Sequence, residues 1–107
     1  MQGVSAEPAV SRKEQKRLEA EERNRRFSQR KPLEARIKSV EKEIETLGVE
    51  RLRLEKMIAA PDMYGETRKE DLKRCLLEQA QVKKKLQGAE ERWLALSAEL
   101  EALAISG

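Results

Sequence analysis

The feature that most constrains this chain is an alternation of apolar residues at steps of four and three. It runs through Leu33, Ile37, Val40, Ile44, Leu47, Arg51, Leu54 and Ile58, where only Arg51 is polar. This is the heptad spacing by which one helix packs against another in a coiled coil. A second such series runs through Leu72, Cys75, Gln79, Val82, Leu86, Ala89, Trp93, Leu96, Leu100 and Leu103. We call each series a seam, and the two seams predict two packed helices.

Turn-forming residues separate the two seams. Pro61 should end the first helix, and residues 61–66 (PDMYGE) are typical of a turn. Thr67 followed by Glu70 is a capping-box pattern, which predicts the start of the next helix. We therefore predict an all-α fold, an antiparallel two-helix coiled-coil hairpin over residues 32–105. Its parts are helix 32–60, tip 61–66 and helix 67–104.

A reversal of the chain around Met63 predicts how the seams face each other. It places Leu33 opposite Trp93, Ile44 opposite Val82 and Leu54 opposite Leu72, in a paired rod about 40 Å long. Beside the seams it predicts favourable Glu41–Lys83, Glu43–Lys85 and Glu55–Lys69 neighbours, and unfavourable Glu34–Glu90, Arg36–Arg92 and Glu50–Glu78 neighbours. Exposed pairs contribute only about 0–1 kcal/mol each. We therefore expect the short loop to fix the orientation and to favour a monomer.

The residues before the hairpin divide into two expected parts. Residues 1–10 show no periodicity and are expected to be a flexible leader. Ser11 with Glu14 is a capping-box pattern, so residues 11–31 should form an additional helical segment. Pro32 would then be a kink or the first position of a new helix. We expect this segment to cover the end of the second helix, with Phe27 near Leu100 and Leu18 beyond it.

The distribution of charge singles out residues 11–31, which we call the basic segment. The chain of 107 residues has 23 Lys plus Arg, 20 Asp plus Glu and a net charge of +3. The basic segment alone holds nine basic and four acidic residues. Its cations are candidates for neutralising nucleic-acid phosphates, or else form an ordinary solvated helix paired with Glu14, Glu19, Glu21 and Glu22. They are Arg12, Lys13, Lys16, Arg17, Arg23, Arg25, Arg26, Arg30 and Lys31.

A second group of candidate nucleic-acid contacts is Lys83, Lys84 and Lys85, which could continue a positive surface along the second helix or could simply be solubilising residues. Phe27, Tyr64 and Trp93 are the only aromatic residues. A platform for stacking bases is therefore not expected, and contacts should go to phosphates.

Composition argues against most enzyme classes. The chain has no His and a single Cys, so it lacks the commonest general base and the ligands of Cys-rich metal sites. No Gly-x-x-x-x-Gly-Lys-Ser/Thr phosphate-binding loop is present. No apolar run approaches the roughly 20 residues that span a bilayer. We expect a non-catalytic, cytoplasmic protein segment with no cofactor, no metal and no membrane partner.

Three short segments together resemble a known family. Arg12-Lys13-Glu14-Gln15-Lys16-Arg17 precedes the hairpin, Ala60-Pro61-Asp62-Met63-Tyr64 forms its tip, and Glu91-Arg92-Trp93-Leu94-Ala95-Leu96 lies near its end. In this order they resemble the C-terminal domain of bacterial ABC-F ATPases of the Uup- and YheS-like subgroup, over roughly residues 12–104. The resemblance implies a coiled-coil hairpin with a basic linker, DNA or ribosomal RNA as partner, and ATPase cassettes upstream in a parent chain.

Two functions follow as hypotheses. The first is a non-catalytic domain that binds DNA or ribosomal RNA through its basic helix surfaces. The second is a structural spacer or protein-interaction coiled coil, with Met63 and Tyr64 at the tip as candidate contacts. No catalytic residue is implied by either.

Overall fold

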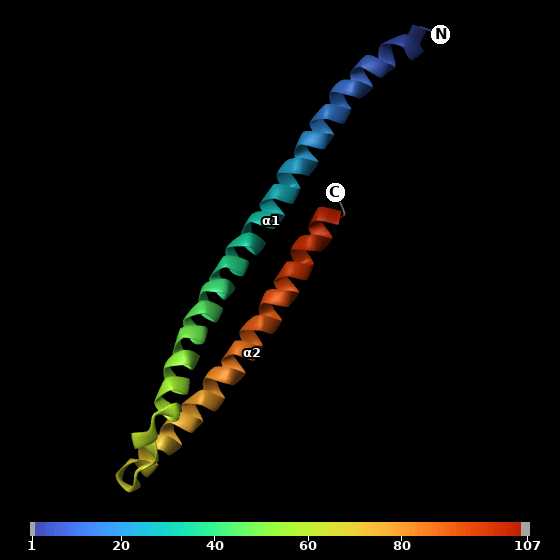
Figure 1. Ribbon diagram of the computed structural model, residues 1–107. Coiled ribbons are helices and arrows are strands. Elements are labelled where there is room, and N and C mark those ends of the chain that lie inside the picture. Colours follow the sequence, from blue (N-terminus) through green and yellow to red (C-terminus); the bar gives the residue numbers. More distant parts are fainter. Residues whose placement is uncertain (1, 106–107) are drawn as a thin grey trace.

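The computed structural model describes the backbone of residues 2–105 and the side chains of residues 11–105. It contains helix α1 (Gln2–Ala59), the short 3-10 turns η1 (Pro61–Tyr64) and η2 (Glu66–Arg68), and helix α2 (Lys69–Ile105). The molecule is a rod of 97 × 14 × 14 Å in which α2 returns along α1. The predicted all-α helical hairpin is therefore confirmed (Figure 1).

The two seams supply the core, as their spacing predicts. Leu33, Val40, Leu47 and Leu54 of α1 are buried, and so are Cys75, Val82, Leu86 and Ala89 of α2. Ile44, Trp93 and Leu96 pack against this core from partly buried positions. Arg51 stays half-exposed, where its guanidinium lies 3.6 Å from Glu55 one turn on. A single layer of contact between two helices holds the rod together.

The predicted register is wrong by one heptad. Arg92 was expected beside Arg36. Instead it donates a hydrogen bond of 2.9 Å to Glu43, which lies seven residues after Arg36 on α1. The Trp93 indole N–H donates to Glu41 at 3.3 Å, and Arg53 lies 3.8 Å from Glu78. The expected Glu41–Lys83 and Glu43–Lys85 neighbours are thus replaced, and Glu55 pairs with Arg51 instead of Lys69.

The tip explains the shift in register. The chain does not reverse tightly around Met63 but winds through η1 and η2 before α2 begins at Lys69, two residues after the predicted start at Thr67. Met63 is only 3% exposed and fills the space under the end of the hairpin. Arg68 ties the tip together, since its side chain lies 2.8 Å from Asp71 and 3.4 Å from Asp62. The midpoint of the turn therefore lies after Met63, further along the chain than predicted.

The boundaries predicted before the hairpin are not seen, because α1 is one continuous, gently curved helix from Gln2 (Figure 1). The backbone of residues 2–10, expected to be a leader, is helical; Met1 and the side chains through Val10 lie outside the described part. Pro32 neither starts nor breaks a helix. Pro32 has no amide hydrogen, so the carbonyl of Ser28, one turn earlier, lacks its usual partner in the helix. Both residues are exposed, so this carbonyl faces water.

A stretch of α1 extends past the end of α2, and we call residues 2–25 the overhang. The basic segment was expected to cover the end of α2 with Phe27 near Leu100, and this is wrong. Phe27 is 55% and Leu18 is 56% exposed, and both lie off the side of α1 that faces α2. Beside the overhang the described chain places no second helix (Figure 1).

Candidate nucleic-acid interface

The basic segment lies on the same helix as the first seam, so its residues can be assigned to faces by continuing the heptad through Pro32. With Leu33 and Val40 at position d and Ile37 at position a, the four positions d, a, e and b form one contiguous arc of the helix. This arc carries eight of the nine cations of the basic segment, and we call it the basic face. Its charged residues are Arg12, Lys13, Lys16, Arg17, Glu19, Arg23, Arg26, Arg30 and Lys31.

The remaining arc, positions f, c and g, carries the other three acidic residues of the segment. These are Glu14, Glu21 and Glu22, together with Arg25. Arg25 lies 2.9 Å from Glu22, and Arg26 lies 3.7 Å from the same carboxylate. Charge is therefore separated across the helix, with only Glu19 among the cations of the basic face.

Most cations of the basic face point into solvent without an acidic partner. Arg12, Lys13, Lys16, Arg17 and Arg23 are exposed, and they form no ion pair with any side chain that the structure describes. Lys31 lies 5.9 Å above the ring of Phe27, and Arg30 lies 3.4 Å from Glu34. The part of the basic face nearest the N-terminus is thus the part whose charge is most available to a ligand.

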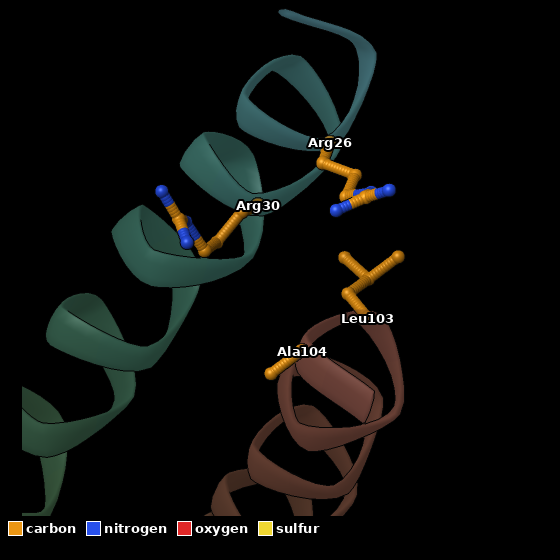
Figure 2. Close-up of a pocket in the computed structure, with 4 residues that line it drawn as sticks. All are labelled: Arg26, Arg30, Leu103 and Ala104. Carbon is orange, nitrogen blue, oxygen red and sulfur yellow. The ribbon is translucent and has the colours of Figure 1, made fainter. Parts of the chain in front are cut away.

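The end of α2 meets the basic face at Arg26 and Arg30. These two side chains and the α2 residues Leu103 and Ala104 line one hollow, and Figure 2 shows Arg26 extending toward Leu103. The last carbonyl groups of a helix carry a partial negative charge. The last turn of α2 holds no basic residue of its own, and Arg26 of α1 is the cation that extends toward it. Arg30 extends away from α2 and lies 3.4 Å from Glu34. Arg23 continues the same side of α1 beyond this point, lining a second hollow with Arg26 and Arg30.

Lys83, Lys84 and Lys85 are exposed on α2 but are not joined to the basic face. In the observed register they lie level with residues near Glu50 of α1, about 25–30 Å along the rod from Lys31. The acidic residues Glu41 and Glu43 lie between the two groups and are engaged with Trp93 and Arg92. The structure thus brings together most of the predicted contacts in the basic segment and separates the lysine triplet from them.

The two candidate tip contacts differ in exposure. Met63 is buried, so its prediction as a surface contact is wrong; it belongs to the packing under the tip. Tyr64 is 62% exposed at the far end of the rod. Only the tyrosine is accessible to a partner.

Within residues 11–105, no group of three or more Cys, Asp or Glu side chains is arranged to hold a metal ion. Cys75 is buried and is not part of a disulfide. Neither helix has, among its described residues, a stretch apolar and long enough to cross a membrane. The candidate interface is the exposed surface formed by the basic face.

Sequence reasoning found the cations but missed that they share a face. The signal was present in the sequence, since counting the four-three steps back from Leu33 leads through Arg30, Arg26, Arg23, Glu19, Lys16 and Arg12. Pro32 hides this signal in the sequence, because a proline usually marks the boundary of a helix. No protein-family model, no curated protein and no solved structure matches this chain significantly.

Proposed function

We propose that this chain is a non-catalytic coiled-coil domain that binds nucleic acid, DNA or ribosomal RNA, through phosphate contacts of the basic face. The observation that carries the proposal is the separation of eight cations, with one carboxylate among them, onto a face that extends past the end of α2. Lys and Arg that neutralise phosphates release condensed counterions, which makes binding strongly dependent on salt. The cations of the hairpin itself are more often paired within the molecule, as with Arg92 and Glu43.

A titration of labelled nucleic acid across a salt series tests this function. The variant R12Q/K16Q/R23Q removes three unpaired cations from the basic face, and K83Q/K84Q/K85Q removes three from α2 with the same change in net charge. If the basic face binds phosphates, the slope of log K against log salt should fall by about 2–3 in the first variant, at about 0.9 per duplex contact. The second variant should keep most of the slope. Equal effects of the two variants, or no binding even at low salt, would contradict the proposal.

The parent protein is part of the same proposal. Three segments resemble the C-terminal domain of ABC-F ATPases, so we infer that ATPase cassettes precede this domain in the parent chain. Reading the parent gene tests this, because two cassettes would each carry a phosphate-binding loop of the Gly-x-x-x-x-Gly-Lys-Ser/Thr type. A parent without such loops would remove the family inference and leave the binding proposal standing.

A structural or protein-interaction role is the second candidate, and the exposure of Tyr64 is the observation that favours it. An exposed aromatic at the end of a rod is the kind of residue enriched at protein interfaces. Tyr64→Ala should abolish capture of a protein partner by the rod while leaving nucleic-acid binding unchanged. Glu66→Ala, a neighbouring exposed change at the tip, is the control. Retained capture by the Tyr64 variant would exclude this role for the tip.

A further inference from the structure

We propose that the overhang of α1 binds in the major groove of B-form DNA, with its basic face toward the bases and both phosphate strands. This inference deepens the proposed function by choosing one form of nucleic acid and one groove. It starts from the fact that the overhang is a single helix. One helix with its side chains is about 10–12 Å across, and the major groove of B-form DNA is about 12 Å wide. The paired part of the rod, with α2 alongside, is too wide to follow it.

The width of the basic face also favours a position inside a groove. It covers four of the seven heptad positions, more than half of the helix surface, and includes Lys13 and Arg17 well away from the line of Arg12, Lys16 and Arg23. A helix lying across one strand of phosphates would use only a narrow line of cations. A helix inside a groove has phosphates on both flanks, and the broad basic face matches that surrounding charge. The opposite arc with Glu14, Glu21 and Glu22 would face out of the groove.

The end of α2 sets how far the helix can enter. Leu103 and Ala104 line one hollow with Arg26 and Arg30, and Arg26 extends toward Leu103, so the end of α2 lies beside α1 at this level (Figure 2). The groove is therefore open to the residues from Arg23 toward the N-terminus. From Arg12 to Arg23 the helix rises about 17 Å, which matches about five base pairs at 3.4 Å each. The same helix does not fit double-stranded RNA, whose major groove is deep and too narrow for protein side chains to read.

Chemical protection identifies the groove directly. Dimethyl sulfate methylates N7 of guanine, which lies in the major groove, and N3 of adenine, which lies in the minor groove. A duplex saturated with the protein should be protected at guanine N7 and unprotected at adenine N3. Protection of adenine N3 alone, or of neither atom under saturation, would overturn the proposal.

Two matched variants test the orientation of the helix. Glu19 is the one carboxylate on the basic face, and Glu21 lies two residues away on the opposite arc. Glu19→Lys should steepen the salt slope for duplex DNA by about one phosphate contact, or 0.9. Glu21→Lys, with the same change in charge, should leave the slope unchanged. Equal slopes in the two variants would exclude the proposed orientation.

Comparison of ligands separates this inference from the proposed function. A DNA duplex should bind at least about tenfold more tightly than an RNA duplex of the same sequence and length, because of the narrow groove of the latter. Equal binding of both duplexes would overturn the groove assignment while the proposed function stands. Absence of binding to either duplex and to ribosomal RNA at low salt would end both.

Discussion

Single residues in the seams carry the stability of this rod, and Leu54 is the clearest case. Its side chain is fully buried, whereas Leu52, on the same helix two residues earlier, is 53% exposed. Leu54→Ala should lower the free energy of unfolding by about 2–5 kcal/mol, and Leu52→Ala should change it by less than about 0.5 kcal/mol. Urea unfolding followed by circular dichroism measures both. Similar losses in the two variants would contradict the observed seam.

At the residue scale, the four-three spacing predicted the buried side chains of both helices. Leu33, Val82 and Ala89 are buried where the heptad places them, and Arg51 extends its charge to solvent from a seam position. Met63 was not predictable in this way. It lies in a turn, where no periodicity indicates which of two neighbouring apolar side chains folds inward. Its burial, and the exposure of Tyr64, depend on the path of η1.

At the scale of elements, the continuity of α1 through Pro32 has a measurable cost. A proline inside a helix removes one hydrogen bond and is about 3 kcal/mol less favourable than alanine. Pro32→Ala should therefore raise the midpoint of thermal unfolding, because the amide of the new residue can bond to the carbonyl of Ser28. Differential scanning calorimetry checks this. A lowered midpoint would show that Pro32 is required at a boundary, as the sequence alone suggests.

The register of the hairpin can be tested with one pair of charges. Glu43 and Arg92 are in contact across the two helices at 2.9 Å. A double-mutant cycle on these residues should give a coupling free energy of about 0.2–1 kcal/mol, as exposed pairs do. The same cycle on Glu43 and Lys85, the neighbours expected from a tight turn, should give none. Coupling found only in the second cycle would restore the register that lies one heptad away.

The two helices of the hairpin were predictable, and their register was not, for a physical reason. A shift of a whole heptad keeps every position a facing a position d, so an apolar seam fits equally well before and after it. What separates the two registers is the tip, where burial of Met63 and the contacts of Arg68 select a longer turn. The charges agree with the outcome, since Arg92 meets Glu43 where the tight turn would have opposed it to Arg36.

For the whole molecule, we predict an elongated monomer. Small-angle scattering should give a longest dimension near the 97 Å of the rod, and sedimentation equilibrium should give the mass of one chain, 12.3 kDa. Two chains that exchanged hairpin arms would have twice that mass. The mass of a dimer would thus contradict the prediction.

The overall balance of charge conceals how the molecule is organised. Composition shows a nearly neutral chain, and the positions of the charges show that the excess lies before the hairpin. That the cations share a face could be seen only once α1 was known to pass through Pro32 without interruption, because the heptad assignment then extends to Arg12. Because Pro32 does not interrupt α1, the heptad positions of the first seam continue through the basic segment, and they place its cations on one face.

The uninterrupted α1 also fixes the distance between the basic face and the tip of the hairpin. Because no hinge separates the basic face from the tip, whatever holds the helix near Arg23 also fixes where Tyr64 lies. The helix rises about 54 Å between Arg23 and Ala59. A ligand bound at the basic face would therefore fix the distance from that ligand at which the tip lies. Removing whole heptads from both helices would shorten this distance in steps of about 10 Å without altering the basic face or the tip.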